Sequence, residues 1–299
     1  MPVSLYPALE LFLDLLRCPK CRARLHPDLR ALRCPAGHTF DIARHGYAGL
    51  LTGTRATSGD DAAMVRARDR FLATGKYGPI CRAVARLAAE ADAVSGQGTV
   101  VDVGCGTGYY LAGVLDQLPG ARGLGLDTSV RALRSAARVH ERAAAATWDV
   151  FRPFPLADGM ADVVLDVFAP RNPAEFRRVL RPSGRLVVVR PTGRHLAELR
   201  GRGPAVVRVD PVKEQRLHRA LAPFFEATRT ERVEYVTSLT RLEALDLIGM
   251  TPSARHLSPA DLDGAGLLPD QVTVSVLATA YRPASVTTSG RTGLLTDGS

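Results

Sequence analysis

Two short pairs of cysteine and histidine residues near the N-terminus have the spacing of metal ligands. Cys18 and Cys21 form a CxxC pair, and Cys34 and His38 follow after twelve intervening residues. Zinc takes four nitrogen or sulfur ligands, and two short pairs bring them together with little strain. His26 is a rival fourth ligand with poorer spacing, and a redox CxxC is disfavoured because no βαβ pattern surrounds it. Four protein ligands close the coordination shell, so the pattern predicts a structural zinc site.

A second chemical pattern is the segment VVDVGCGTGYY at 100–110. A β-branched run is followed by Gly104, Gly106 and Gly108, and apolar residues then recur at helical spacing. A buried strand, a tight turn and a helix start place a ligand against the helix N-terminus. Glycine suits this turn because a Cβ would keep the backbone from the ligand and because positive φ angles are needed. The alternative is an ordinary strand-to-helix turn whose glycines are coincidental.

Acidic residues occur where a nucleoside site needs them. Asp127 ends the next strand, at the distance from the glycine turn expected for a residue that binds a ribose diol; the alternative is helix capping ahead of Ser129. Asp102, just before the turn, can brace the loop or receive a ligand ammonium. Asp149, with Trp148, could flank an adenine ring. The spacing GCGTG can serve either a dinucleotide or S-adenosylmethionine.

The elements that position these residues alternate between strand and helix from residue 99 onward. Strands are predicted at 99–103, 123–127, 145–148, 161–167, 185–190, 231–237 and 272–281. Helices are predicted at 62–72, 76–87, 109–118, 129–140, 173–180, 193–202, 210–222 and 240–248, with a PSG turn at 182–184. This order predicts an α/β fold with a doubly wound, parallel sheet and right-handed crossovers.

The chain divides into four expected regions. We expect a zinc-binding RNA-recognition module at 1–45, a linker or lid at 46–75, a catalytic domain at 76–282 and a disordered tail at 283–299. No apolar run reaches the roughly 20 residues that span a bilayer, and the N-terminus lacks the pattern of a signal peptide. We therefore expect a cytoplasmic protein without a membrane partner.

The charge of the chain favours an anionic partner. The formal net charge is +9, and only three of the 39 basic residues are lysines. Arginine forks onto phosphate and stacks on bases, which suits RNA, although codon bias in a GC-rich genome gives the same preference. Five basic residues gather around the predicted zinc site and suggest a phosphate-contacting surface, with an ordinary solvated face as the alternative. They are Lys20, Arg22, Arg24, Arg30 and Arg33.

Several motifs resemble known methyltransferases. DVGCGTGY, GLDTS at 125–129 and RPSGRL at 181–186 resemble motifs of class I (Rossmann-like) S-adenosylmethionine-dependent methyltransferases over roughly 99–192. A closer resemblance, to the RlmA family of ribosomal large-subunit RNA guanine-N1 methyltransferases, covers the whole chain except the segment before Cys18 and the tail after 282. It is carried by CPKC, CPAGH, FDIARHGYAGLL at 40–51, GDDAAMVRARDRFLATGKYGP at 59–79, FAPRNPAEFRRVLRP at 168–182 and PTGRHLAELRG at 191–201.

This resemblance implies S-adenosylmethionine as cofactor and a zinc ion held by Cys18, Cys21, Cys34 and His38. It also implies cofactor contacts at Tyr77 and His195, which by themselves would be taken for a surface aromatic and a lone helix-start histidine. Together with the residues of the glycine turn, the predicted cofactor-binding set is Tyr77, Asp102, Gly104, Gly106, Thr107, Gly108, Asp127 and His195.

The implied reaction is methylation of guanine N1 in a hairpin of 23S rRNA. The arginine-rich composition suggests an actinobacterial source, hence position 748 and the family branch linked to tylosin resistance. N1 lies on the Watson–Crick edge and carries a proton, so the base must be unpaired and a proton acceptor is needed. Asp166 or a backbone carbonyl in 167–170 could accept that proton, and we assign no base.

Three alternatives stay open. The neighbouring guanine 745 could be the target, the substrate could be a small molecule, or the chain could be a zinc-containing RNA-binding protein without activity. A homodimer is a further expectation that the sequence does not test. Intact glycines and Asp127 argue against the inactive protein.

Overall fold

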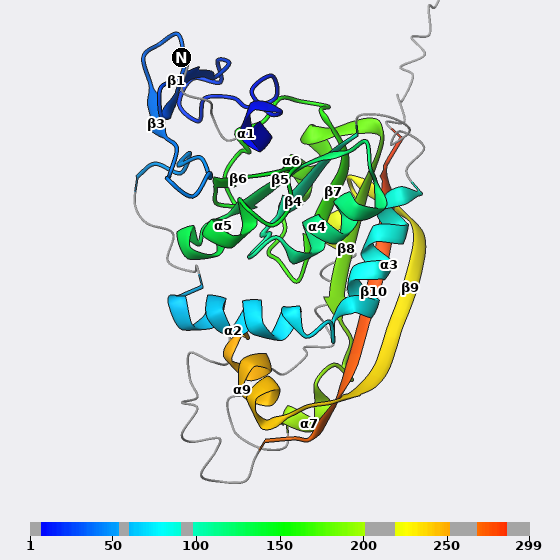
Figure 1. The fold of residues 1–299 in the computed structure, drawn as a ribbon. Coiled ribbons are helices and arrows are strands. Elements are labelled where there is room, and N and C mark those ends of the chain that lie inside the picture. The colour runs from blue at the N-terminus through cyan, green and yellow to red at the C-terminus, as the bar shows by residue number, and fades with distance from the viewer. Residues whose placement is uncertain (1–6, 54–59, 91–97, 201–218, 252–267, 286–299) are drawn as a thin grey trace, which may run out of the picture.

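The computed structural model describes residues 7–53, 60–90, 98–200, 219–251 and 268–285. These residues form a small three-stranded sheet near the N-terminus and a seven-stranded sheet with helices on both faces (Figure 1). Within the described ranges, no helix combines the length and the apolar character needed to cross a bilayer.

The large sheet has the strand order β6-β5-β4-β7-β8-β10-β9. Its strands are β4 (Thr99–Val103), β5 (Arg122–Asp127), β6 (Ala143–Thr147), β7 (Ala161–Val167), β8 (Leu180–Pro191), β9 (Phe225–Ser238) and β10 (Gln271–Pro283). The first five run parallel, and the chain's first strand in this sheet, β4, lies between β5 and β7. The doubly wound fold is therefore confirmed.

The prediction of an entirely parallel sheet was wrong for β10. This strand lies between β8 and β9 and is antiparallel to both. Most of its residues are buried, on both faces of the sheet, and such an apolar run gives no signal of strand direction. The expected turn at 182–184 falls within β8, at an irregularity where the pairing with β7 passes from Leu180 directly to Arg185.

Helices cover both faces of the sheet (Figure 1). They are α1 (Pro7–Glu10), α2 (Ala62–Ala73), α3 (Gly78–Ala89), α4 (Tyr109–Gln117), α5 (Val130–Ala136), α6 (Pro173–Val179), α7 (Ala197–Arg200) and α9 (Arg241–Gly249). α5 is shorter than predicted, and only 197–200 of the helix expected at 193–202 is described as helical. Most of the helix expected at 210–222 and most of the expected tail lie outside the described residues.

Side chains on the two faces of the sheet form two separate cores. On one face, Val100 and Val163 pack with α3, α4 and α9. On the other face, Val101 and Leu124 pack with α6 and with the N-terminal region, including Leu16, which is fully buried. Strand alternation therefore gives each face its own apolar partners, and the N-terminal region belongs to one of these cores.

The N-terminal region carries the small sheet β1 (His26–Asp28), β2 (Ala31–Arg33) and β3 (Thr39–Asp41). Backbone hydrogen bonds attach this region to the large sheet. The N–H of Ala48 donates to the carbonyl of Ala145 at 2.9 Å, and the N–H of Thr147 donates back to the carbonyl of Ala48 at 2.9 Å. Ala48 therefore extends the free edge of β6, and the small sheet cannot move independently of the large one without breaking this pairing.

Candidate functional site

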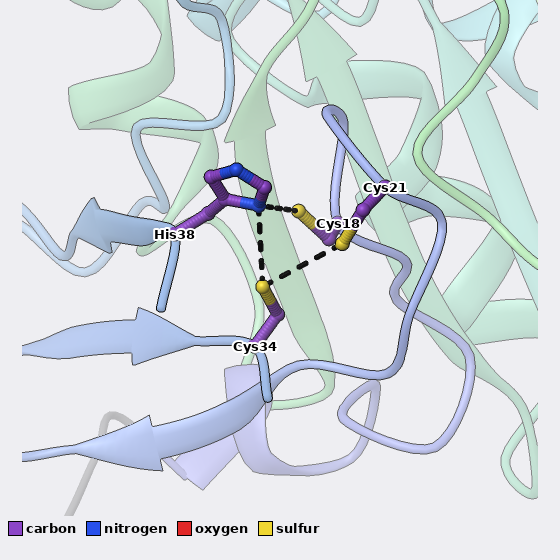
Figure 2. Close-up of side chains that lie close together, drawn as sticks. All are labelled: Cys18, Cys21, Cys34 and His38. Atoms are coloured by element: carbon purple, nitrogen blue, oxygen red, sulfur yellow. Dashed lines mark hydrogen bonds between the residues drawn. The ribbon is translucent and has the colours of Figure 1, made fainter. Parts of the chain in front are cut away.

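The four predicted metal ligands converge in the N-terminal region (Figure 2). Their ligand atoms all lie within 4.8 Å of one another. Nδ1 of His38 is 3.5 Å from Sγ of Cys18 and 3.4 Å from Sγ of Cys34, and Sγ of Cys21 is 3.6 Å from Sγ of Cys34. Ligands at the roughly 2.0–2.3 Å bond lengths of tetrahedral zinc would be separated by about 3.5 Å. The rival His26 is exposed and is not part of the cluster.

Tight backbone turns hold each pair of ligands. The carbonyl of Cys18 accepts from the N–H of Arg22 at 2.8 Å, and the carbonyl of Cys34 accepts from the N–H of Gly37 at 2.9 Å. Arg22 has a φ of +63° and Gly37 a φ of +81°, so each turn contains one left-handed residue. The β1–β2 hairpin brings the second turn back to the first. Local turns and one hairpin therefore build the whole ligand set.

A cavity of about 510 Å³ lies at the carboxyl ends of β4, β5, β6 and β7. Open α/β sheets bind their ligands at this edge, where the strand order reverses. The glycine turn after β4 forms part of the cavity wall, as does the end of β5 at Asp127. Seven of the eight predicted cofactor-binding residues line the cavity. They are Tyr77, Asp102, Gly104, Gly106, Thr107, Asp127 and His195.

Gly104 and Gly108 explain why the turn is rich in glycine. Both have positive φ, +73° and +85°. A Cβ on Gly104 would lie 2.6 Å from Cβ of Ala169, in the loop after β7. Gly108 lies outside the cavity lining, and a Cβ there would meet Val139 Cγ1 at 2.9 Å, just after α5. The turn therefore needs small residues both for its backbone conformation and for close packing.

Asp127 braces the glycine turn with both carboxylate oxygens. Oδ2 accepts from the N–H of Gly106 at 2.9 Å, and Oδ1 accepts from the N–H of Ser129 at 2.8 Å. Burial raises the pKa of Asp127, and these two backbone donors oppose that shift. An ionised carboxylate offers about four acceptor positions, so Asp127 keeps capacity for a ligand hydroxyl while it holds the turn.

Two buried polar atoms in the cavity wall lack protein partners. Within the described residues, neither Oδ2 of Asp102 nor Nε1 of Trp148 has a hydrogen-bond partner, and both side chains are nearly fully buried. Burial and, to a lesser extent, the nearby charge of Asp127 together raise the pKa of Asp102 to about 8. A buried acceptor and a buried donor without partners are costly unless a ligand satisfies them. The wall therefore suits a ligand that carries both a cation and an acceptor.

Aromatic side chains form another part of the cavity wall. Tyr77 is 3% exposed, so its interpretation from the residues alone as a surface aromatic was wrong. Its ring centroid lies 6.3 Å from that of His195 and 6.5 Å from that of Phe168. His195 is held by the N–H of Ser275, which donates to Nδ1 at 3.2 Å. Long-range packing against α2 and β10 therefore brings Tyr77 and His195 to one wall.

Helix α2 closes one side of the cavity, between the large sheet and α9 (Figure 1). Arg68 and Leu72 of α2 line the cavity. Arg68 donates to the carbonyl of Met250 at 3.0 Å and forms an ion pair with Asp60. The predicted charged helix at 62–72 indicated a covering segment, but no sequence signal indicated that residues around α9 complete it.

Comparisons with known proteins agree with this geometry. A family model described as the N-terminal region of RlmA matches residues 16–55, and a methyltransferase domain model matches residues 100–184. The 23S rRNA (guanine(748)-N1)-methyltransferase of Streptomyces fradiae is 45% identical over 271 residues, which cover 90% of this chain and 96% of that protein. A candidate 23S rRNA (guanine-N1)-methyltransferase of Micromonospora griseorubida is 48% identical over 90% of this chain and 97% of that protein.

A third relative, the candidate 23S rRNA (guanine-N1)-methyltransferase YxjB of Bacillus subtilis, is 33% identical over 81% of this chain and 87% of that protein. These similarities extend over the N-terminal ligand cluster and the cavity alike. The chain belongs to the RlmA family.

S-adenosylmethionine and structural zinc are the cofactors of this RlmA-family fold, and the residues present fit both. Three thiols and one imidazole are a donor set of structural zinc sites. The sulfonium cofactor carries an ammonium group, a ribose diol and an adenine. Oδ2 of Asp102, which has no hydrogen-bond partner among the described residues, suits the ammonium, and Asp127, at the strand end, suits the diol.

Asp166 does not line the cavity of this RlmA-family protein. It is fully buried, and its Oδ1 lies 3.3 Å from Nε of Arg171. Burial raises its pKa well above the ordinary value. Residues 167–170 do line the cavity. Of the two suggested proton acceptors, only the backbone of 167–170 is therefore at the site.

The predicted phosphate-contacting surface needs a correction at one residue. Arg22 donates to the carbonyls of Phe154 at 2.5 Å and Leu156 at 2.9 Å, so its guanidinium attaches the zinc region to the large domain. Arg33 lies 3.5 Å from a carboxylate oxygen of Asp28 in an exposed pair, which is weak. Lys20, Arg24 and Arg30 are exposed.

Proposed function

We propose that this protein transfers a methyl group from S-adenosylmethionine to N1 of guanine 748 in a hairpin of 23S rRNA. The observation that carries the proposal is the 45% identity over nearly the full length of the Streptomyces fradiae enzyme, whose name specifies that guanine. Oδ2 of Asp102, which lacks a hydrogen-bond partner in the described part of the chain, and the Cys3His cluster support it independently.

Individual residues take separate parts of the cofactor in this proposal. Asp102 receives the ammonium, Asp127 the ribose hydroxyls, and the wall formed by Trp148 and Asp149 flanks the adenine. The backbone of the glycine turn approaches the cofactor closely because no Cβ intervenes. Tyr77, Thr107 and His195 complete the enclosure. Each assignment is supported by the residue's place in the cavity lining.

The protein's part in the reaction is alignment and proton removal. The bound cofactor supplies a methyl group that is already electrophilic. The cavity must hold guanine N1 in line with the breaking bond, which can contribute a large part of the rate. N1 must also lose its proton to solvent water, and the backbone carbonyls of 167–170 lie at the cavity wall, where one can accept a hydrogen bond from N1–H.

RNA binding is proposed for the zinc region and the adjacent face of α5. Desolvation and the nearby charges of Arg44, Arg134 and Arg138 lower the pKa of His45, in agreement with a cluster of three arginines around this side chain. Arg134 and Arg138 are exposed on or next to α5, and Arg44 is exposed in the N-terminal region. A positive surface that joins both regions suits an RNA backbone.

The division of the chain is part of the same proposal. Residues 1–45 read the RNA, 46–75 link and cover the cavity, 76–282 bind the cofactor and 283–299 form a tail. A cytoplasmic location would give access to ribosomal RNA. The homodimer stays a prediction.

Methyl transfer to a hairpin of 23S rRNA, followed by primer extension, tests the function. A methyl group on N1 blocks Watson–Crick pairing, so we expect a stop next to position 748. A stop at 745 would support the alternative guanine. Methylation of a small metabolite without RNA, or RNA binding without methylation, would contradict the proposal. Expression in a tylosin-sensitive host tests the link to resistance, with growth at higher drug concentration as the expected result.

A further inference from the structure

Phe168 combines an exposed aromatic ring with a positive φ, two features that occur separately in the cavity wall at Phe151, which is 69% exposed, and at Leu196, whose φ is +54°. Phe168 follows β7, lines the cavity and is 40% exposed, although it is a large apolar residue. Its φ is +56°, in the left-handed region that costs a non-glycine residue free energy. Residues held in such conformations concentrate at ligand sites, where the surrounding structure imposes them. An exposed aromatic ring on a strained backbone therefore calls for a ligand.

The ring of Phe168 is oriented by its neighbours. It stacks on the imidazole of His195, with centroids 5.9 Å apart and an interplanar angle of 21°. Tyr110 lies edge-on, at a centroid distance of 6.4 Å. The N–H of Phe168 donates to the carbonyl of Val189 at 3.2 Å, which fixes the backbone. The ring is therefore held in place before any substrate arrives.

Phe168 also lies next to the part of the cavity where the methyl donor binds. The following residue, Ala169, packs directly on the glycine turn, at the place where a Cβ on Gly104 would be only 2.6 Å from Cβ of Ala169. Tyr77 and His195, both assigned to the cofactor enclosure, are ring neighbours of Phe168. A planar group that stacks on Phe168 would thus be close to the glycine turn.

We propose that Phe168 is the stacking platform for the extruded target guanine. The inference rests on the proposed function, because it needs a base as the methyl acceptor. Aromatic side chains hold unpaired bases through their faces, and an extruded base must find such a partner to offset its lost stacking in the RNA. Phe168 orients N1 toward the cofactor, while a neighbouring backbone carbonyl of 167–170 accepts a hydrogen bond from N1–H and the proton released on methyl transfer passes to solvent water.

Three substitutions at this position separate a stacking role from a structural one. Phe168→Leu keeps apolar volume but removes the ring, Phe168→Tyr keeps the ring, and Phe168→Gly relieves the positive φ. For each variant, kcat and KM are measured with a 23S rRNA hairpin, cofactor Kd by calorimetry and Tm by thermal unfolding. Leu242→Ala, which shortens an exposed apolar side chain on α9 outside the cavity lining, is the control.

We expect Phe168→Leu to lower kcat/KM for RNA by about tenfold or more, the range of base–aromatic stacking, with cofactor Kd unchanged. Phe168→Tyr should restore most of the activity. Phe168→Gly should be as inactive as Phe168→Leu while its Tm stays the same or rises, because the backbone strain is gone. The control should match the wild type.

Other outcomes overturn the proposal. Wild-type activity in Phe168→Leu, a parallel loss of cofactor binding, or a Phe168→Tyr variant as poor as Phe168→Leu would each exclude a stacking platform. A wild-type protein that methylates no RNA would overturn the proposed function and this inference together. An active wild type with an active Phe168→Leu variant would overturn the inference alone.

Discussion

The zinc-ligand cluster and the cofactor cavity are built in opposite ways. The four ligands come from one short segment between Cys18 and His38, held by two turns and a hairpin. The walls of the cavity come from segments spread between Asp60 and Thr251. One site is local in the chain, and the other exists only when the large sheet, α2 and α9 are packed together.

This difference determines how each site should respond to damage. A zinc site with four protein ligands loses its metal, and the fold around it, when one or two ligands are removed. A cavity lined by many segments should lose only part of its cofactor affinity with each substitution, by an amount that depends on which segment is changed. The two sites are nevertheless joined, since Arg22 beside Cys21 donates to the carbonyls of Phe154 and Leu156, and Phe154 lines the cavity.

The largest effect is expected from removal of the zinc ligands. Cys18→Ser with Cys21→Ser should abolish zinc binding, which is worth about 10–16 kcal/mol in small zinc modules, and β1–β3 should unfold. Metal analysis and hydrogen exchange of the β1–β3 amides measure this. His26→Ala is the control and should keep its zinc, because His26 lies outside the cluster. Retained zinc in the double variant would show that the assignment of the ligands is wrong.

Gly104→Ala is expected to damage the cavity severely. The new Cβ would lie 2.6 Å from Cβ of Ala169, and the φ of Gly104 is +73°. We therefore expect the free energy of unfolding to fall by about 2–4 kcal/mol and cofactor binding to weaken. Gly159→Ala is the matched control: its φ is +56° but no atom lies within 4 Å of the new Cβ, so only about 1 kcal/mol should be lost. Denaturant unfolding compares the two, and equal losses would contradict the packing argument.

Asp102 should make cofactor binding depend on pH. Its pKa in the folded protein, about 8, lies above the ordinary 3.8. Folded Asp102 therefore keeps its proton between these values, and its contribution to stability falls as pH rises through that window. A bound ammonium favours the ionised carboxylate, so binding at pH 6.5 should release a proton and affinity should increase with pH.

Calorimetry in two buffers with different ionisation enthalpies measures this proton release. Asp102→Asn should abolish it and weaken cofactor binding by about tenfold, or 1.4 kcal/mol, through the loss of a charged partner. Unchanged proton release in Asp102→Asn would place the titrating group elsewhere.

A smaller effect is expected at the contact between α2 and α9. Arg70 donates to both carboxylate oxygens of Asp246, at 2.9 and 2.5 Å, and Asp246 is nearly buried. Because the Arg70 side chain is 53% exposed, Arg70→Ala should cost only about 1 kcal/mol and speed cofactor release a few-fold. Arg66→Ala, one turn earlier on the same helix, is the control. Stopped-flow release rates that are equal in the two variants would exclude a covering role for this contact.

Local signals made part of this structure predictable from the sequence. The bounds predicted for β4 and β7 agree with the structure, and for β4 they are marked by the flanking Gly98 and Gly104. The four zinc ligands were predicted from their spacing alone. The geometry of a motif confined to a few residues is determined by those residues alone.

Long-range packing explains what could not be predicted. The direction of β10 depends on strands far away in the sequence, and the burial of Tyr77 depends on Phe71 and the cavity wall. Asp166 is fully buried and does not line the cavity, because only the end of β7 reaches it, and the position of β7 in the sheet is set by distant strands. Arg22 resembled a phosphate contact, but its partners lie more than 130 residues further along the chain.

The most direct test of the two-site division compares cofactor affinity and RNA activity in one zinc-ligand variant. In Cys18→Ser with Cys21→Ser, calorimetry should give a cofactor Kd within about threefold of the wild type. The value of kcat/KM for a 23S rRNA hairpin should fall by about a hundredfold, equivalent to about 2.7 kcal/mol. Equal losses of cofactor binding and RNA methylation would contradict a zinc region that recognises RNA separately from the methyl-transfer cavity.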